Sequence, residues 1–569
     1  MFSKHRLSNL VSLSLILVLG CAASFSIVAY QDPQRERQVT PSPSPTPAPI
    51  PSPSSSPVGA PTPTPTTAAR IANTTKTLAE LQTRIAEILR KPELASAMVG
   101  IKIASLDTGR VLFEENANKL LRPASNMKLY TVAAALDRLT PDYHFVTSVY
   151  AKEKPDQSGT IKGDLIVYGR GDPSLAARFN NGDYFKGIDD LATKIAGAGV
   201  KRVEGDLVGD ETYFTGAQYG SGWEWEDLQW YYGAEVSALT VNDNALDLFI
   251  KPGAQVGARA LVTTGPPDPL LTIVNRVTTG PKGAKRELRV HRGLGENTLE
   301  VSGSIPLDDR GYTGGVGISH PALLFVYLLR SALAQHGVTV TGKARTAGQV
   351  NQSLLTTGAT VTMAANGAGD PPAVSLIEIA TMQSPPFSVV AAQTLKPSQN
   401  LYTELILRTL GKVVPPATAS SNPARTAEDA GIEVVKTFLK EVGLNADALV
   451  LTDGSGLSRN DMVTAEATVR LLTYMSKHKY ANVLREALPI AGVDGTLRNR
   501  FRGTVAENNV RAKTGSLSSA ASLSGYVTTA AGENLVFSIM VNNYPPDAEP
   551  RTVCIDPIAV LLASFAGRS

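Results

Sequence analysis

Ser125 and Lys128 stand three residues apart in the stretch LLRPASNMKLYTVAAAL, residues 120–136. An α-helix turns once in about 3.6 residues, so side chains at i and i+3 share one face, where a hydroxyl and an amine can exchange a proton. Pro123 precedes the predicted helix and places Ser125 at its N-terminus, where free backbone amides can stabilise an oxyanion. Because a serine there can also be a plain helix cap, the pair needs companions elsewhere in the chain.

Two further motifs follow the pair along the chain. Residues 398–400 read S-Q-N and residues 513–515 read K-T-G, which completes the series S-x-x-K, S-x-N, K-T-G. The chain also holds decoys, S-x-x-K at 476–479 and S-x-N at 458–460. K-T-G occurs once, and the 476–479 pair follows both S-x-N motifs, so only the series that starts at Ser125 has the three motifs in order. The ordered series favours a catalytic serine over a cap.

With these motifs, the chain resembles the penicillin-recognising serine hydrolases. In particular it resembles the D-alanyl-D-alanine carboxypeptidases/endopeptidases of the class C low-molecular-mass penicillin-binding proteins, peptidase family S13. The resemblance extends from about residue 77 to the C-terminus. Its supporting segments are YGRGDPSL at 168–175, SALTVNDNAL at 237–246, MQSPPFSVVAAQTLKPSQNLYTELIL at 382–407, DGSGLSRND at 453–461 and RAKTGSLSSAASLSGYV at 511–527.

The motifs predict an acyl-serine mechanism. A serine hydroxyl is a weak nucleophile until a base takes its proton, and with no histidine motif at hand the base for Ser125 is Lys128. We expect burial and the nearby positive charge of Lys513 to lower the pKa of Lys128 enough for it to act. The resemblance implies that the backbone amides of Ser125 and Ser516 form the oxyanion hole.

The remaining motif residues are expected to hold the substrate and move protons. Ser398 can relay a proton to the leaving amine, and the Asn400 amide can orient both Lys128 and the scissile peptide bond. Lys513 and Thr514 would hold a terminal carboxylate through charge and hydroxyl. Gly515 has no side chain, so substrate backbone could approach its strand closely.

A terminal carboxylate beside a scissile amide describes the D-Ala-D-Ala end of a peptidoglycan stem peptide, which β-lactams mimic. A β-lactamase or esterase on the same scaffold is a rival reading, as is a catalytically weak cell-envelope binding protein. No glutamate between the S-x-N and K-T-G motifs stands in the E-x-x-L-N context of a class A deacylation loop, which favours the peptidase. Asp453 and Ser455 either line the cleft or form a plain glycine turn.

Charge and composition exclude several other functions. The 54 basic and 51 acidic residues give a net charge of only +3, with no clustered basic stripe, so we expect no nucleic-acid partner. The six histidines are scattered, and no H-E-x-x-H, G-x-S-x-G or phosphate-loop motif occurs. We therefore expect no metal and no cofactor.

The N-terminal segments predict delivery outside the cytoplasm. Residues 1–30 carry basic residues before the apolar run 10–29, as a signal peptide or an N-terminal membrane anchor does. Cys21 could be lipidated, although Leu19 is bulky for such a site, and we expect no disulfide with Cys554. Residues 31–76, rich in Pro, Ser and Thr, read as an extended linker. We expect a periplasmic or cell-envelope protein that could be anchored to a membrane.

Motif spacing predicts the domain organisation. Residues 77–145 and 376–569 would form the two parts of a catalytic domain, because the motifs must converge although they lie far apart in the chain. Residues 146–375 would form one or more inserted, mainly-β domains, since apolar and polar positions alternate there between glycine turns, with helical texture from about 319. The expected fold is α+β, with the catalytic sheet flanked by helices.

Overall fold

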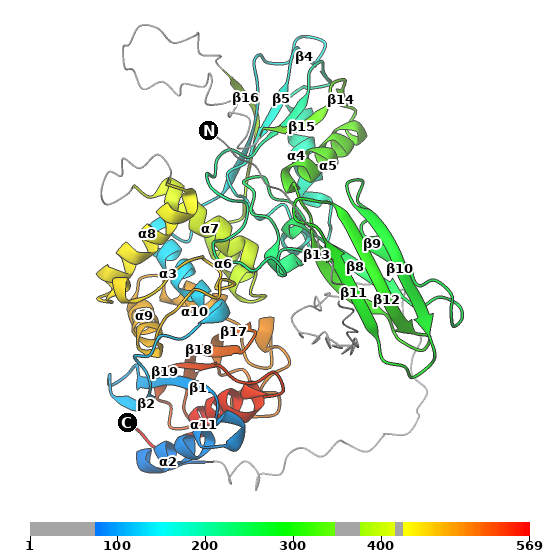
Figure 1. Ribbon diagram of the computed structural model, residues 1–569. Coiled ribbons are helices and arrows are strands. Elements are labelled where there is room, and N and C mark those ends of the chain that lie inside the picture. Colours follow the sequence, from blue (N-terminus) through cyan, green and yellow to red (C-terminus); the bar gives the residue numbers. More distant parts are fainter. Residues whose placement is uncertain (1–73, 348–375, 416–424) are drawn as a thin grey trace, which may run out of the picture.

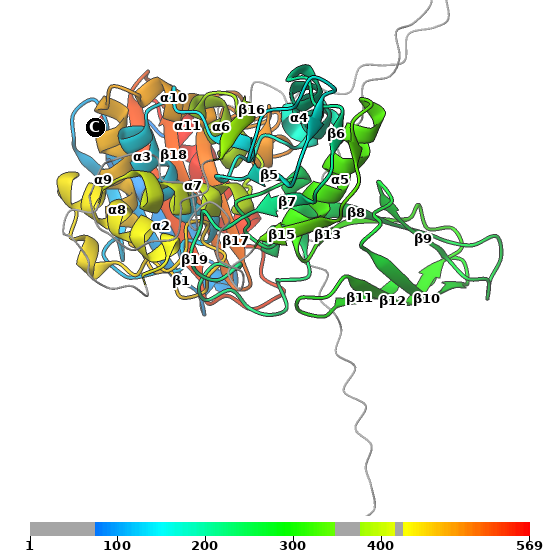
Figure 2. The same cartoon turned by 90° about the horizontal axis from the view of Figure 1, so that it is seen from above.

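A computed structural model describes residues 74–347, 376–415 and 425–569 of the chain (Figure 1). The expected signal peptide or anchor and nearly all of the expected linker, with Cys21, fall outside these residues. Within the described ranges, no helix combines the length and the apolar composition that crossing a bilayer requires. The motifs are carried by a sheet with helices on both faces, and a second group of strands and helices lies beside it (Figures 1 and 2).

The first sheet is antiparallel throughout and has the strand order β17-β18-β19-β1-β2. Strands β1 and β2 flank the turn that the sequence D-T-G at residues 107–109 predicts, while β17, β18 and β19 come from the C-terminal end of the chain. The central strands β18 and β19 are buried on both faces. In β19 this burial explains the nearly continuous apolar sequence LVFSIMV. The strands are β1 (Met98–Ser105), β2 (Val111–Glu115), β17 (Arg511–Leu517), β18 (Ala520–Thr528) and β19 (Asn534–Asn542).

Helices cover both faces of this sheet. Leu535 and Phe537 of β19 face a core shared with α2 (Leu78–Leu89) and α11 (Asp556–Ser564), while Val536 faces the opposite core, as alternation along a strand requires. The opposite core contains α3 (Met127–Leu139), α6 (Phe387–Leu395), α7 (Asn400–Val413), α8 (Ala427–Glu441), α9 (Ala465–Lys477) and α10 (Ala481–Ala487). A sheet flanked by helices confirms the expected α+β class.

A second sheet, of order β15-β7-β5-β3-β16, lies between the first sheet and the far end of the molecule. Two helices, α4 (Lys186–Gly197) and α5 (Pro321–Gln335), pack against it. The sequence patterns did not predict α4. The strands of the second sheet are β3 (Val146–Ala151), β5 (Leu165–Tyr168), β7 (Leu207–Asp210), β15 (Ala344–Ala347) and β16 (Ile377–Gln383), and a small sheet joins β4 (Thr160–Ile161), β6 (Arg202–Val203) and β14 (Thr339–Val340).

Two three-stranded sheets project from this region, away from the helices of the first (Figure 2). They contain the strand-like segments that the sequence predicted between glycine turns. The strands are β8 (Ala245–Lys251), β9 (Leu261–Gly265) and β13 (Tyr312–Gly317) in one sheet, and β10 (Thr272–Gly280), β11 (Glu287–Arg292) and β12 (Thr298–Pro306) in the other.

The chain leaves and re-enters the helical part at neighbouring points. Phe145 and Ser384 exchange hydrogen bonds, with Ser384 N–H donating to the Phe145 carbonyl (2.9 Å) and Phe145 N–H donating to Ser384 Oγ (3.0 Å). Between them, β16 pairs antiparallel with β3, so residues 377–383 belong to the second sheet and not with the residues that follow them. This pairing favours a return to the catalytic part near Ser384, later than the 375/376 division that spacing suggested.

Candidate active site

Ser125 lies in a single 3-10 turn, Ala124–Asn126, that leads directly into α3. Ala124, immediately before it, has a left-handed φ of 48°. Lys128, in the first turn of α3, reaches back so that its Nζ lies 3.0 Å from Ser125 Oγ. The spacing of the motif therefore brings the hydroxyl and the amine into hydrogen-bond contact.

Two glycines allow other segments to pack against this turn. A Cβ on Gly456 would lie 1.9 Å from the Ala124 carbonyl oxygen, and a Cβ on Gly515 would lie 2.5 Å from the Pro123 oxygen and 2.2 Å from Ser522 Oγ. Glycine at 515 was expected to make room for substrate. The structure adds a further reason for glycine here, which is the close approach of the serine turn to strand β17.

Lys128 is fully buried, and its amine has three partners. Besides Ser125 Oγ, Nζ contacts Asn400 Oδ1 at 2.5 Å and the Ser455 carbonyl at 2.7 Å. Burial lowers the pKa of Lys128 to about 7, against the opposing attraction of nearby carboxylates, of which Asp453 is the strongest. Near neutral pH, the amine can therefore lose a proton to become a base and regain it.

Lys513 is the second buried amine of the site. Its Nζ donates to Ser398 Oγ and to the Thr514 carbonyl, both at 2.8 Å. Burial, and after it the positive charge of Lys128, holds the pKa of Lys513 well below its usual range. The sequence argument assigned the repulsion between the two amines to Lys128. In the structure its effect falls on Lys513, and burial is the larger cause at both residues.

Asn400 is the first residue of α7, and both ends of its side-chain amide are engaged. Its Oδ1 accepts from Lys128, and its Nδ2 donates to the Tyr232 carbonyl at 2.8 Å. Ser398, two residues earlier, has a left-handed φ of 64°. The Gln399 side chain caps α7 by accepting from Leu401 N–H at 3.2 Å. The S-x-N motif is thus a helix start with its middle residue as the cap.

Thr514 and Ser516 lie on β17 beyond Lys513, and alternation along the strand places them on one face. The Thr514 hydroxyl is within 2.8 Å of the Thr496 hydroxyl. The decoy Ser476 lies in α9 instead, where its hydroxyl donates to the Thr473 carbonyl at 2.8 Å. The structure therefore brings the three ordered motifs together and leaves the 476–479 pair on another helix.

The DGSG segment is both a glycine turn and a part of this site. The Ser455 carbonyl accepts from Lys128, while Asp453 is fully buried beneath it. The Asp453 carboxylate accepts from the side chains of Trp223 (2.8 Å) and Ser455 (2.9 Å) and from the backbone N–H groups of Gly456 (2.6 Å), Leu457 (3.1 Å) and Ser458 (3.1 Å). Asp453 thereby fixes the loop that presents a carbonyl to the lysine.

Two buried acids near Lys128 were missed in the sequence. Glu404 accepts from Gly454 N–H at 3.0 Å, and Asp461 accepts from Thr452 N–H at 2.6 Å. Burial and, after it, the charge of Asp453 raise the pKa of both groups well above the usual range. Glu404 was detectable in principle, because it interrupts the apolar face of LYTELILRTL.

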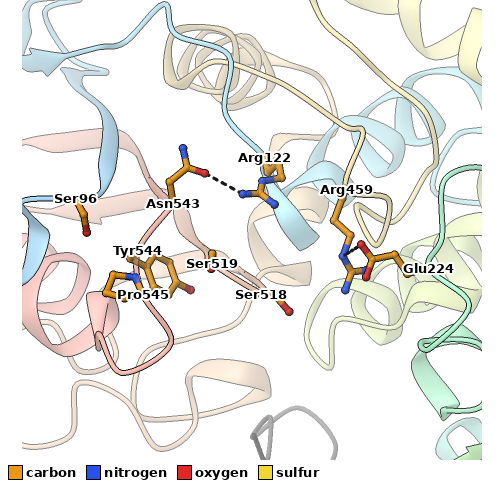
Figure 3. A pocket seen from close by; sticks show the side chains of 9 residues that line it. All are labelled: Ser96, Arg122, Glu224, Arg459, Ser518, Ser519, Asn543, Tyr544 and Pro545. Carbon is orange, nitrogen blue, oxygen red and sulfur yellow. Dashed lines mark hydrogen bonds and ion pairs between the residues drawn. The ribbon is translucent and has the colours of Figure 1, made fainter. Parts of the chain in front are cut away.

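A pocket of about 570 Å³ adjoins the site (Figure 3). Ser518 and Ser519 at the end of β17 line it on one side and Arg122, three residues before Ser125, on another. The Arg122 guanidinium donates to Asn543 Oδ1 at 3.0 Å, while Arg459 pairs with Glu224 at 2.9 Å. The pocket wall therefore carries two cations close to the ends of the serine and K-T-G motifs.

Comparison with known proteins agrees with this geometry. Residues 81–565 match the model of the D-Ala-D-Ala carboxypeptidase 3 (S13) family. The chain belongs to this family. It is 36% identical over 503 residues to the D-alanyl-D-alanine carboxypeptidase of Actinomadura sp. (strain R39), a match that covers 86% of each chain.

A second relative and a solved structure come from Haemophilus influenzae. The D-alanyl-D-alanine carboxypeptidase DacB of Haemophilus influenzae is 25% identical over 462 residues, covering 80% of this chain and 87% of the relative. The crystal structure of penicillin binding protein 4 (dacB) from Haemophilus influenzae superposes with a TM-score of 0.67 at 22% identity, covering 84% of this chain and 97% of the other. The fold is therefore that of a penicillin-recognising serine hydrolase.

Proposed function

We propose that this protein is a serine-type D-Ala-D-Ala carboxypeptidase, with D-Ala-D-Ala endopeptidase activity, that cleaves peptidoglycan stem peptides through an acyl-serine intermediate. One observation carries the proposal. Lys128 Nζ lies 3.0 Å from Ser125 Oγ in a chain that belongs to the S13 family. A serine hydroxyl next to a buried amine with a pKa of about 7 is an activated nucleophile at neutral pH.

In acylation, neutral Lys128 takes the hydroxyl proton as Ser125 Oγ attacks the carbonyl of the penultimate D-alanine. The Oγ–C bond forms, and the backbone amides of Ser125 and Ser516 stabilise the oxyanion. When the C–N bond breaks, the leaving amine receives the proton through Ser398. The contact between Ser398 Oγ and Lys513 Nζ at 2.8 Å supports a relay in this position.

In deacylation, water replaces the departed amine and gives a proton to Lys128 as it attacks the ester. The tetrahedral intermediate collapses, the C–Oγ bond breaks, and Ser125 Oγ recovers its proton from Lys128. The acyl group leaves as a carboxylic acid, which releases its remaining proton to solvent and becomes a carboxylate. Asn400 keeps Lys128 in place throughout, because its amide oxygen contacts Nζ and its amide nitrogen is held by the Tyr232 carbonyl.

Substrate binding is proposed to involve Lys513 and Thr514, which hold the terminal carboxylate. An anion beside a buried amine favours the ammonium form, so carboxylate binding and proton uptake by Lys513 occur together. Gly515 contributes by letting the serine turn pack against β17. The pocket that Arg122 lines supports a longer peptide substrate, since stem peptides carry further carboxylates that this arginine can contact. Arg459 is already paired with Glu224 and Asp227.

β-Lactams are proposed as inhibitors, because they present a carboxylate and an acylating amide to the same groups. The S13 match favours the peptidase over a β-lactamase, an esterase or a weak binding protein. Since the peptide substrate lies in the cell envelope, we infer that the protein acts there. Export by residues 1–30, cleavage or retention of that segment as an anchor, and a periplasmic location are parts of this proposal.

We also propose the domain division that the spacing predicts, with a catalytic domain interrupted by an inserted region. The hydrogen bonds between Phe145 and Ser384 support boundaries near these two residues. The inserted region has an apolar core of its own, built from the second sheet, α4, α5 and the projecting strands.

A labelling experiment tests the nucleophile. Ser125→Ala should abolish covalent labelling by a fluorescent penicillin and hydrolysis of a D-Ala-D-Ala peptide, whereas Ser476→Ala, the matched decoy, should retain both. Labelling of the Ser125→Ala protein would refute the assignment. Mass spectrometry should show a penicilloyl adduct that outlasts one peptide turnover. If the adduct were hydrolysed as fast as the peptide is cleaved, the protein would be assigned as a β-lactamase.

A further inference from the structure

Residues 212–232, which we call the crossing segment, run from the inserted region onto the helices that carry the catalytic motifs. Its backbone carbonyls at Thr215 and Tyr219 accept from Ala427 N–H (2.9 Å) and Arg408 Nη2 (3.2 Å). Ser221 donates to Glu428 through both its N–H and its hydroxyl, each at 3.0 Å. The crossing segment is therefore fastened to α7 and α8 along its length.

The crossing segment also contacts the two groups that hold the amine of Lys128. The Trp223 indole N–H donates to Asp453 Oδ2 at 2.8 Å, and the Tyr232 carbonyl accepts from Asn400 Nδ2 at 2.8 Å. Asp453 organises the loop whose Ser455 carbonyl contacts Lys128. The Tyr232 contact therefore lies one residue away from the amine, through Asn400, and the Trp223 contact lies two residues away, through Asp453 and Ser455.

Close packing keeps the crossing segment against the DGSG loop. Gly222 has a φ of 76°, and a Cβ there would lie 2.4 Å from Ser458 Oγ. The neighbouring Trp223 is partly buried, whereas Trp225 is 64% exposed. The Trp223 indole, which reaches Asp453, is thus built into the contact, and the Trp225 indole is not.

We propose that the inserted region positions the general base. The crossing segment holds one acceptor of Lys128, Asn400, directly through Tyr232. It holds a second, the Ser455 carbonyl, through Asp453, with Trp223 as the positioning residue. The inference rests on the proposed role of Lys128 as the base. It gives the inserted region a part in the chemistry, in addition to any part in shaping access to the cleft.

The charge around Lys128 gives the proposal a signature. Asp453 raises the proton affinity of Lys128, and removing its charge should lower the pKa of the lysine. The Trp223 N–H withdraws part of that negative charge, so losing the donor should raise the pKa of the lysine. The other charged groups are Asp461 on the DGSG segment, Glu404 on α7 and Lys513 on β17, with Arg408 and Glu428 beyond Glu404.

The test measures the rate of penicillin acylation against pH in the full chain. In Asp453→Asn, the acidic limb of the profile should move to lower pH by about one unit. In Trp223→Phe, the limb should move to higher pH by about half a unit, and the plateau rate should fall. Trp225→Phe should leave the profile unchanged. In the double variant, Trp223→Phe should add no further shift, because the carboxylate through which it acts is gone.

The inference would be overturned if the acidic limb of the pH–rate profile kept its position in both single variants. It would also be overturned if the shift in the double variant equalled the sum of the two single shifts. If Asp453→Asn fails to fold, as judged by circular dichroism, the direction of the Trp223→Phe shift alone decides the question. Failure of the proposed function would give a different result. The wild-type protein would then show no acidic limb near neutral pH, or the Ser125→Ala variant would still be labelled by penicillin.

Discussion

Lys128 shows how burial and charge compete at one residue. Three acids lie close enough to favour its ammonium form, yet complete burial outweighs them and lowers its pKa to about 7. Among the three acids, Asp453 opposes the effect of burial on the pKa of Lys128 most strongly. The amine therefore needs no histidine and no metal to become a base at neutral pH in the proposed mechanism.

Replacing Lys128 by arginine tests this proton affinity. Wild-type acylation by penicillin should rise with pH through about 7 and reach a plateau, because the neutral amine is the active form. Lys128→Arg keeps the positive charge but cannot lose its proton, so acylation should fall by at least ~100-fold across the pH range. Stopped-flow labelling measures the rate, and near-normal acylation would mean that another group takes the serine proton.

Among the elements, the packing of the first sheet against the turn that carries Ser125 depends on glycine residues, which have no side chain. Gly515 of β17 and Gly456 of the DGSG loop enclose the turn that precedes α3 from two directions. The motifs predicted from sequence which helix and which strand must meet, and β1, β2 and α3 lie where periodicity and turn residues placed them. Periodicity could not reveal the contact of the Tyr232 carbonyl with Asn400, because that contact depends on the path of the backbone.

Adding one methyl group to β17 tests this packing. Gly515→Ala should destabilise the protein by about 1–3 kcal/mol and slow acylation, because the new Cβ overlaps the Pro123 carbonyl and Ser522 Oγ. The matched control is Gly197→Ala in α4, where no atom lies within 4 Å of the added Cβ and alanine favours the helix. Thermal melts and labelling rates compare the two, and equal melting temperatures would contradict the packing argument.

In the whole molecule, the apolar core of the helices that carry the motifs and the apolar core of the inserted region are connected by more than the two points, near Phe145 and Ser384, where the chain passes between them. A further cluster combines Phe214 and Val236 with Tyr402 and Leu405 of α7, so the inserted region rests on the helix that begins at Asn400. The alternation of apolar and polar positions correctly predicted strands within residues 146–375, and the domain division that the motif spacing suggests stays a prediction. The sequence did not reveal the contacts of Phe214 and Val236 with α7, because contacts made by a long loop leave no periodic signal.

Excision tests whether the catalytic part depends on the inserted region. Because Phe145 and Ser384 are hydrogen-bonded neighbours, residues 146–383 can be replaced by a short glycine-serine turn. We expect the remaining part to retain helix and sheet signals in circular dichroism, yet to acylate with penicillin at least ~10-fold more slowly, since Trp223 and Tyr232 are lost with the insertion. Full-rate acylation by a folded excised protein would show that the catalytic part is self-sufficient.

The contact of the Tyr232 carbonyl with Asn400 affects how this enzyme can vary. A backbone carbonyl belongs to no particular side chain, so exchanging the residue at 232 for another leaves the acceptor in place. Only a change in chain length or chain path around it, such as a deletion, an insertion or a proline, removes the acceptor. A substitution that slows the reaction with β-lactams by breaking this hydrogen bond would therefore be expected at Asn400, which contributes a side chain, and not at residue 232.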